Sequence, residues 1–368
     1  MLFPLEYVEK CGLYNFIELP LHFFKTIITE NEYSDVLFPA WFVPILNKSP
    51  KLLKEFEDLA NKILEKNTLK RKKIYAVFLN NNRISRLCGN KLYKLKVLDD
   101  DLQDVAVSAQ KVFSRLYNTT LQGTLVEKEF GESLHDHYIK FRTINASQAC
   151  PFCGLENYPD RLKNSRSQYD HYLNKSKYCF SSVNFENLIP MCSVCNEAPN
   201  KHMKDLLFDI QNGNTRRLVF YPYSNCSGAE VNLINIVPSK VGDGGQWRVD
   251  VTPSDNEEQE QVDTWKNVFN IEDRYAARVA EEAEKWIVEF ICQSILPNSN
   301  DTNTWRAAFQ AWAEILSGIN ELKVVRNGNL KQAYFEYLNR DALEPEIIGI
   351  ISMAQSDIFA ARQIAIGE

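Results

Sequence analysis

Apolar residues repeat every three to four positions in the N-terminal part of the chain, a spacing that predicts helices. The repeat is clearest at residues 51–65, where Leu52, Phe56, Leu59 and Ile63 would share one side of an amphipathic helix. The segment KIYAVFL (73–79) has the β-branched and aromatic composition of a short buried strand, with a helix as the open alternative at that length. We therefore expect a mostly helical N-terminal region at 1–143.

The pattern changes after residue 213. Candidate strands lie at 218–223, 231–237 and 247–251, and the turn-rich VGDGGQ precedes the last of them. A polar linker at 252–261 follows. Three periodic segments then predict helices at about 273–296, 303–325 and 341–364; caps are expected at Asn303 or Thr304 for the second helix and at Asp341 for the third. We expect residues 213–368 to form a small β element followed by helices, and the whole chain to be α+β, mainly α.

Composition narrows the protein class. At 368 residues with 45% hydrophobic and 24% charged residues, the chain should fold as two or three soluble globular units. The first residues lack a basic segment followed by an apolar stretch, and the later run LFPAWFVPIL is short and broken by Pro39 and Pro44. We therefore expect a cytoplasmic protein without membrane insertion. Its nine cysteines are expected to be reduced, because disulfides accompany export.

Charge is unevenly distributed along the chain. The net charge of −6 does not favour a dedicated DNA binder, which is usually basic. Residues 141–217 nevertheless carry ten Lys and Arg against seven Asp and Glu, whereas residues 253–290 carry four against eleven. A basic run at 66–73 is interpreted as a solvated helix end in preference to a phosphate-binding patch.

Two CxxC pairs carry the strongest local pattern. They are Cys150-Pro-Phe-Cys153 and Cys192-Ser-Val-Cys195, separated by 38 residues. Paired CxxC units in a chain of cytosolic type indicate a tetrahedral thiolate site for zinc, with a redox pair as the alternative. Four thiolates close the coordination sphere, so this Zn²⁺ would be structural. The remaining cysteines, Cys11, Cys88, Cys179, Cys226 and Cys292, are interpreted as buried small apolar residues.

The segment YDHYLNKSKYCFSSVNFENLIPMCSVCN (169–196) resembles the HNH, or ββα-metal, nuclease motif. That motif has an Asp-His pair on a first strand, an Asn-Leu pair on a second strand and a Cys-x-x-Cys-Asn segment that opens a helix. It is most similar to the zinc-stapled branch, which includes phage junction resolvases, restriction-type enzymes and bacterial defence nucleases. The resemblance implies a nuclease module at 144–212. It further implies that His171 is the general base, that Asp170 and Asn196 bind the catalytic divalent ion, and that Asn187 braces the loop.

The resemblance covers about 60 of the 368 residues, and the chain departs from the motif at two points. Asn174 stands where a proline is usual, and Glu197 follows the Cys-Asn pair where a lysine–glycine pair is common. Pro199 is compatible only with the first turn of a helix. Basic residues in or just after the module are candidate nucleic-acid contacts: Lys175, Lys177, Lys201, Lys204, Arg216 and Arg217.

The residue types fit phosphodiester hydrolysis independently of the resemblance. The reaction needs an activated water and a cation that neutralises charge on the phosphate. The imidazole of His171 can accept a proton near neutral pH. Asp170 and Asn196 offer hard oxygen atoms to Mg²⁺ or Mn²⁺. An additional pattern, His135-Asp136-His137, resembles a metal pair on a strand but has no nearby partner in the sequence.

These patterns predict an HNH endonuclease that acts on DNA, and the resemblance implies an effector of a bacterial anti-phage defence or restriction system. The acidic flanking regions suit a protein partner, such as an ATPase or sensor subunit, or self-association; plain scaffolding is the alternative. A different functional class is a catalytically silent zinc adaptor that binds nucleic acid or protein. A zinc deaminase is disfavoured, because four cysteines leave zinc no open position and no glutamate follows His171 at the required spacing.

Overall fold

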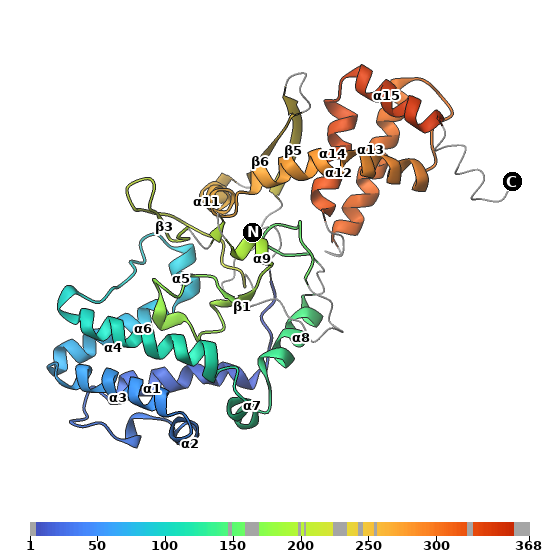
Figure 1. Cartoon of the computed structure of the whole chain (residues 1–368). Helices are drawn as coiled ribbons and strands as arrows, with labels where there is room; N and C mark the ends of the chain where they lie inside the picture. The colour runs from blue at the N-terminus through green and yellow to red at the C-terminus, as the bar shows by residue number, and fades with distance from the viewer. Residues whose placement is uncertain are drawn as a thin grey trace. The chain divides into compact units, whose positions relative to one another are not determined.

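The computed structural model of the chain describes residues 5–145, 149–158, 169–197, 200–201, 204–223, 234–241, 246–253, 256–321 and 327–356 (Figure 1). The chain divides into two compact units. The N-terminal unit comprises Pro4–Asn145 and Pro159–Val231, and the C-terminal unit comprises Met1–Phe3, Ala146–Tyr158 and Asn232–Glu368. The described residues are mainly helical with two-stranded antiparallel sheets, which confirms the α+β, mainly α class. The predicted segments 1–143, 144–212 and 213–368 stay predictions, because the bounds of a compact unit do not show where a functional module begins.

The described part of the N-terminal unit is a set of short helices around small strands. Its α-helices are α1 (Glu18–Thr26), α2 (Val43–Asn47), α3 (Pro50–Leu64), α4 (Thr68–Asn81), α5 (Ile84–Gly89), α6 (Gln103–Arg115), α7 (Thr124–Phe130), α8 (Leu134–Ile144) and α9 (Ser193–Asn196). Its strands are β1 (Tyr169–His171), β2 (Leu188–Pro190), β3 (Phe208–Asp209) and β4 (Thr215–Arg216). The strands pair as β1 with β2 and β3 with β4, both antiparallel.

Phenylalanine rings form the core of the N-terminal unit. Phe24 of α1 stacks on Phe78 of α4 with ring centroids 5.1 Å apart. Phe180 meets Phe24 edge-on at 5.4 Å and Phe113 of α6 edge-on at 5.5 Å. Edge-to-face and offset stacks are the favoured geometries for aromatic pairs. Because Phe180 lies between β1 and β2, this core also anchors the loop that joins the two strands.

The predicted helix at 51–65 is confirmed as α3, whose buried residues include Leu52, Phe56, Leu59 and Ile63. The strand predicted at 73–79 is wrong, because these residues lie inside helix α4. The side chain of Asn67 caps α4 by accepting from the backbone N–H of Lys70 at 3.0 Å. A seven-residue apolar run fits the period of a helix or of a strand, so the cap and the surrounding packing decide between the two structures.

The basic run at 66–73 lies at the start of α4, as its interpretation as a helix end requires. Three of its four lysines pair with aspartates at the start of α6 and just before it: Lys66 with Asp104 at 2.8 Å, Lys70 with Asp101 at 2.6 Å, and Lys73 with Asp99. The guanidinium of Arg71 donates to the backbone carbonyls of Leu64 and Glu30. These contacts show that the basic side chains join α4 to neighbouring segments. They argue against a phosphate-binding patch.

The C-terminal unit contains a β-hairpin and a helical bundle. The hairpin pairs β5 (Ile234–Val241) with β6 (Gln246–Pro253). The helices are α11 (Gln259–Phe269), α12 (Ile271–Gln293), α13 (Thr302–Glu321), α14 (Gly328–Arg340) and α15 (Glu344–Gln355). Phe290, Phe309 and Phe335 meet in the bundle core, where Trp305 and Trp312 are also buried. None of the helices within the described ranges is both long and apolar enough to cross a membrane.

Several predicted elements need correction in this half of the chain. Residues 218–223 are irregular and do not form a strand, and residues 231–233 lie outside the described residues. The linker predicted at 252–261 instead contains the end of β6 and the start of α11, and α14 was not predicted. The carboxylate of Asp301, and not Asn303 or Thr304, caps α13 by accepting from the Thr304 N–H at 2.9 Å. Asp341 ends α14, while α15 begins three residues later.

A buried histidine lies in the N-terminal unit. His137 of α8 is 1% exposed, its Nε2 atom lies 2.9 Å from the Tyr14 hydroxyl, and its Nδ1 atom contacts the Tyr169 hydroxyl. Asp136 forms a capping box with Ser133, so the His135-Asp136-His137 pattern begins a helix and not a strand. Within the described ranges, the only group of three or more residues able to hold a metal ion is a set of four cysteines.

The first prediction concerns the pH dependence of stability. Burial lowers the pKa of His137 from 6.5 to about 4, with a smaller opposing effect of Glu132. The unfolded chain therefore binds a proton before the folded chain does, so stability present above pH 6.5 is lost as the pH falls toward 4. His137 should account for a loss of about 2 kcal/mol between pH 7.5 and pH 5.

Urea unfolding followed by circular dichroism at the two pH values tests this expectation in wild type and in His137→Gln. The variant should lose clearly less stability over this interval. The neighbour His135 is only half-buried, so His135→Gln is the control and should keep the wild-type dependence. Equal losses in wild type and His137→Gln would contradict the assignment.

Candidate active site and metal centre

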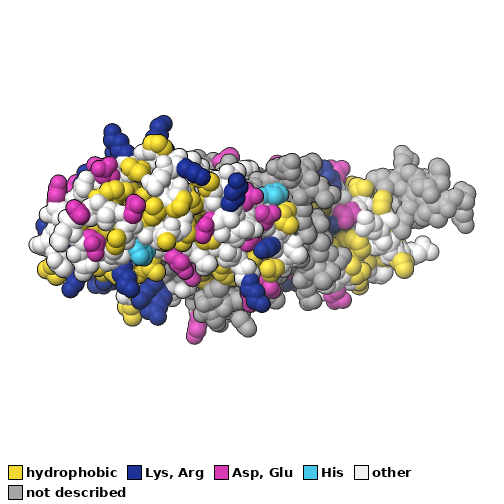
Figure 2. All heavy atoms as spheres, turned by 90° about the horizontal axis from the view of Figure 1, so that it is seen from below, with side chains coloured by type: hydrophobic (Ala, Val, Ile, Leu, Met, Phe, Trp, Pro, Cys, Tyr) yellow, Lys and Arg dark blue, Asp and Glu magenta, His cyan; other side chains and the backbone are white. Residues whose placement is uncertain are grey.

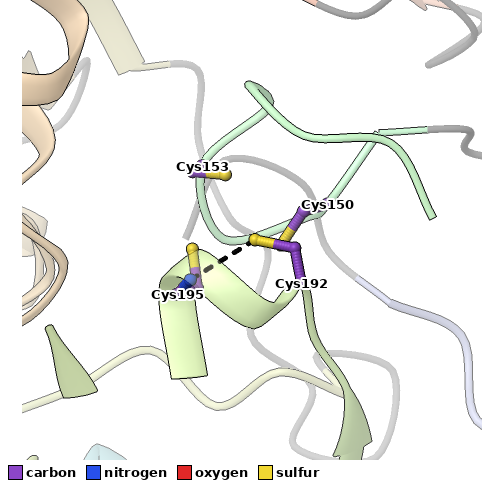
Figure 3. Close-up of side chains that lie close together, drawn as sticks. All are labelled: Cys150, Cys153, Cys192 and Cys195. Atoms are coloured by element: carbon purple, nitrogen blue, oxygen red, sulfur yellow. Dashed lines mark hydrogen bonds between the residues drawn. The ribbon is translucent and has the colours of Figure 1, made fainter. Parts of the chain in front are cut away.

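Four buried cysteines form the clearest candidate metal site (Figure 3). The Sγ atoms of Cys150, Cys153, Cys192 and Cys195 all lie within 4.8 Å of one another, and no disulfide joins them. Zinc–thiolate bonds of about 2.3 Å place the sulfurs of a tetrahedral site about 3.8 Å apart, so the cluster is the right size for one ion. The cluster can therefore hold a metal such as zinc.

Local backbone structure shapes each CxxC pair. After Cys153 the chain turns through Gly154, whose φ of 66° is costly for residues with a side chain, and the Gly154 N–H donates to the Cys150 carbonyl at 2.7 Å. Cys192 caps α9, and its sulfur accepts from the Cys195 N–H at 3.4 Å. N–H groups directed at sulfur stabilise thiolates, which are the metal-binding form of cysteine.

The first CxxC turn is supported inside the C-terminal unit. Trp265 of α11 donates its indole N–H to the Phe152 carbonyl at 2.7 Å. Tyr275 of α12 donates its hydroxyl to the Cys153 carbonyl at 2.9 Å. These bonds hold the turn at two successive residues. Trp265 and Tyr275 lie more than a hundred residues away in the sequence, so the CxxC pattern itself gave no indication of these two partners.

The second CxxC pair follows a short β-hairpin in the N-terminal unit. In the β1–β2 pair, Asp170 lies opposite Ile189 and His171 lies opposite Leu188. Asp170 and His171 are thus on a first strand, as expected, while Asn187 lies one residue before the second strand. Helix α9 is only four residues long and ends at Asn196, whereas the motif implied a helix opening there.

Asn187 is fully buried and holds the two ends of the β1–β2 loop. Its Oδ1 atom accepts from the Leu173 N–H at 2.7 Å, and its Nδ2 atom donates to the Leu173 carbonyl at 3.1 Å. Nδ2 also lies 3.1 Å from the Ser181 hydroxyl, in the middle of the loop. A single amide therefore fixes the exit from β1, the loop and the approach to β2.

The position and protonation of His171 follow from two neighbours. Its Nε2 atom lies 2.9 Å from the Ser182 carbonyl, and the Tyr117 ring meets the imidazole edge-on with centroids 4.2 Å apart. A carbonyl can only accept, so Nε2 carries the proton and Nδ1 has the lone pair. Burial lowers the pKa of His171 to about 3, and the positive charges of Lys175 and Lys201 lower it further. The ring is therefore neutral at neutral pH.

Asp170, Asn196 and Lys201 form a contiguous polar group. The Asn196 amide donates to both Asp170 carboxylate oxygens, at 2.9 and 3.0 Å, in the orientation that satisfies both groups. The Lys201 ammonium contacts the same carboxylate, and the Lys201 side chain is only 4% exposed. A buried ammonium needs such a partner, because desolvation of an unpaired charge is costly.

These residues line a cavity of about 810 Å³, which we call the catalytic cavity because it contains the candidate catalytic residues. Its floor contains the predicted site residues Asp170, His171, Asn196 and Lys201. Asn187 does not line it and acts through the loop. The rest of the lining comes from two other segments, and its residues are Tyr117, Asn118, Gln122, Tyr169, Asn174, Lys175 and Ser176.

The predicted nucleic-acid contacts have different environments. Lys175 and Lys201 line the catalytic cavity, whereas Lys177 pairs with Asp205 at 3.1 Å. The guanidinium of Arg216 donates to the Leu87 and Arg217 carbonyls, and that of Arg217 donates to the Leu206 and Asp205 carbonyls. Lys204 is half-buried. Their role toward DNA stays a prediction, with the two lysines in the cavity best placed.

Sequence reasoning missed Tyr117, Asn118 and Gln122, which lie in the helical N-terminal region far from the motif. A weak indication was present. The run YNTT interrupts the apolar periodicity of α6 and forms a π-helical turn, Leu116–Thr120. Such turns occur often at functional sites. The expected burial of the remaining cysteines is confirmed for Cys11 and Cys88, while Cys179 is half-buried, Cys292 is exposed and Cys226 lies outside the described residues.

No protein-family model, curated protein or solved structure matches the chain. The assignment therefore depends on the residues of the motif and on the geometry around them. Figure 2 shows one face of the molecule, on which Lys and Arg are interspersed with Asp and Glu over the described residues. Among the described residues on that face, no continuous basic patch suggests where nucleic acid would bind.

The second prediction is that the purified protein contains a single zinc ion in the four-cysteine cluster. Cys192→Ala should lose the ion and unfold more easily, because binding energy at a closed thiolate site is also folding energy. Elemental analysis and thermal melting measure both effects. Cys292→Ala removes an exposed cysteine outside the cluster and is the control. Metal-free wild type prepared without chelator would contradict this prediction.

Proposed function

We propose that the chain is a metal-dependent endonuclease of the HNH kind that hydrolyses phosphodiester bonds of DNA. In this proposal His171 is the general base, Asp170 and Asn196 hold one Mg²⁺ or Mn²⁺ ion, and zinc at the four cysteines is structural. The observation that supports it best is the orientation of His171 on the floor of the catalytic cavity, beside a carboxylate and an amide.

The proton-accepting atom of His171 is defined by hydrogen bonding. With Nε2–H donated to Ser182, the lone pair on Nδ1 remains to take a proton from water. The Tyr117 ring restricts rotation of the imidazole from the side. A neutral, fixed imidazole in a polar cavity is what in-line attack by water on a phosphate requires.

Asp170 and Asn196 fit a hard divalent cation. Their side-chain polar atoms already lie about 3 Å apart, and both residues line the cavity. An amide turned about its last torsion presents oxygen where it had presented nitrogen, so Asn196 can offer Oδ1 beside the Asp170 carboxylate. The ion, when bound, neutralises charge on the phosphate and on the departing oxygen.

Lysines supply the remaining positive charge. Lys201 offsets Asp170 at the floor, and Lys175 stands on the wall with its ammonium 3.0 Å from the Asn118 oxygen. Two cations at different depths suit a phosphodiester that enters from the rim. Phosphate contacts of this kind give sequence-independent, salt-dependent binding.

The biological setting follows from the resemblance alone. It suggests an effector of a bacterial anti-phage defence or restriction system, with a separate ATPase or sensor subunit or self-association restraining the nuclease. The acidic helices α11 and α12 provide a surface suited to a protein partner and unsuited to DNA. The competing function, a zinc adaptor without activity, does not require a cavity that brings His171, Asp170 and Asn196 together.

The third prediction tests the base. Wild-type protein should cleave plasmid DNA with Mg²⁺ or Mn²⁺ and stop in EDTA, and His171→Ala should lower the rate roughly a hundredfold or more while zinc content is unchanged. His22 makes the same type of contact, Nε2 to the Val36 carbonyl at 3.0 Å, outside the cavity, so His22→Ala is the matched control. Wild-type protein that leaves DNA intact under all these conditions would favour the adaptor.

The fourth prediction tests the catalytic ion. Asp170→Asn keeps the shape of the side chain and removes its charge, so the Mn²⁺ concentration for half-maximal cleavage should rise roughly tenfold or more. Titration of cleavage rate against Mn²⁺ measures the change. Asp35→Asn, an exposed position outside the cavity, should leave the titration unaltered. An unchanged Mn²⁺ requirement in Asp170→Asn would place the ion elsewhere.

A further inference from the structure

The walls of the catalytic cavity contain residues that the proposed chemistry does not use. One wall comes from the π-helical turn Leu116–Thr120, where the Leu121 N–H donates to the Leu116 carbonyl at 2.8 Å. The turn follows α6 directly and contributes Tyr117 and Asn118 to the lining. The other wall is the start of the β1–β2 loop, with Asn174 and Lys175.

Direct contacts join the two walls. The Lys175 ammonium donates to the Asn118 side-chain oxygen at 3.0 Å and lies 4.8 Å from the centre of the Tyr117 ring. The Tyr117 hydroxyl donates to the backbone carbonyl of Tyr169 in β1. The walls are therefore positioned with respect to the catalytic strand, and Tyr117 contacts both the rim lysine and the His171 ring.

Amide side chains dominate these walls. Asn118, Gln122 and Asn174 each line the cavity, and an amide offers both a donor and an acceptor. Within the described part of the chain, the amide nitrogens of Asn118 and Asn174 have no hydrogen-bond partner. Paired donors and acceptors match the edges of nucleobases, whereas phosphates offer acceptors only.

The burial of His171 limits which DNA can reach this residue. His171 is 4% exposed, so a phosphate that reaches it must bring the adjoining sugar and base into the cavity. The volume of about 810 Å³ is large enough for this, since pockets of roughly 300 to 1,000 Å³ enclose small ligands. A base that is paired and stacked in a duplex cannot enter while it keeps its partner.

We propose that the amide-lined walls form a binding subsite for one unpaired nucleotide next to the scissile phosphate. Asn118, Gln122 and Asn174 would contact the base edge, and Lys175 the phosphate. The substrate is then single-stranded or locally unpaired DNA, and continuous duplex is a poor substrate. This inference rests on the proposed nuclease function and specifies its substrate class.

Binding measurements test the subsite separately from catalysis. Full-length His171→Ala protein is titrated into fluorescein-labelled DNA of one sequence, as a single strand, as a duplex and as a duplex with an unpaired bulge, with Ca²⁺ present. Fluorescence anisotropy gives each affinity. The test variant adds Asn118→Ala and Gln122→Ala. The control adds Asn61→Ala and Gln103→Ala, which are also an exposed asparagine and glutamine of this unit but lie outside the cavity.

Single-stranded and bulged DNA should bind more tightly than duplex. The test variant should weaken that binding about tenfold and leave duplex binding unchanged, while the control binds as its parent does. Equal affinity for duplex and single strand, equal behaviour of the two double variants, or no DNA binding would overturn the subsite. If single-stranded and bulged DNA bind selectively but the wild-type protein cleaves no DNA, the subsite would be supported and only the proposed nuclease function would be refuted.

Discussion

The buried amide of Asn187 is the contact on which the geometry of the catalytic cavity depends. It forms hydrogen bonds with both backbone groups of Leu173 and with the Ser181 hydroxyl, and so holds two residues of the β1–β2 loop. An apolar side chain at this position would leave two buried backbone groups unpaired, at a cost of about 1–3 kcal/mol each. The loop would then change its backbone conformation. The Ser182 carbonyl would no longer lie beside His171, and Lys175 would no longer line the cavity.

The β1–β2 loop also determines the tautomer of His171. The Ser182 carbonyl selects the tautomer of His171 and burial keeps it neutral, so its basic atom is defined before any substrate arrives. Phe180, two residues before Ser182, packs the same loop into the aromatic core. Side chains that never touch the cavity thus determine the chemistry inside it, as expected where function lies on rigidly supported elements.

The proposed function needs two cation sites that differ in chemistry. Four buried sulfurs suit zinc and leave it no open position, which would restrict that ion to a structural role. In the proposal, Asp170 and Asn196 would offer oxygen atoms in the cavity, the donor set of a Mg²⁺-type ion that keeps positions for water and phosphate. The two sets are adjacent in sequence through Cys195 and Asn196, so the backbone that presents the last thiolate also begins the oxygen site.

The sequence alone determined features set by short-range spacing. The two CxxC pairs and the amphipathic helix α3 each depend on neighbours a few positions apart, and the structure agrees with both. The strand position of Asp170 and His171 was implied by the motif resemblance, and the structure agrees with it as well. Where a pattern fits two periods, as in the run that became α4, spacing could not decide. Only the tertiary structure brought Tyr117 and Asn118 to the motif, from more than 50 residues away, and gave Arg216 and Arg217 backbone carbonyls as partners. These contacts depend on how loops and helices pack in three dimensions, and no local period in the sequence records that packing.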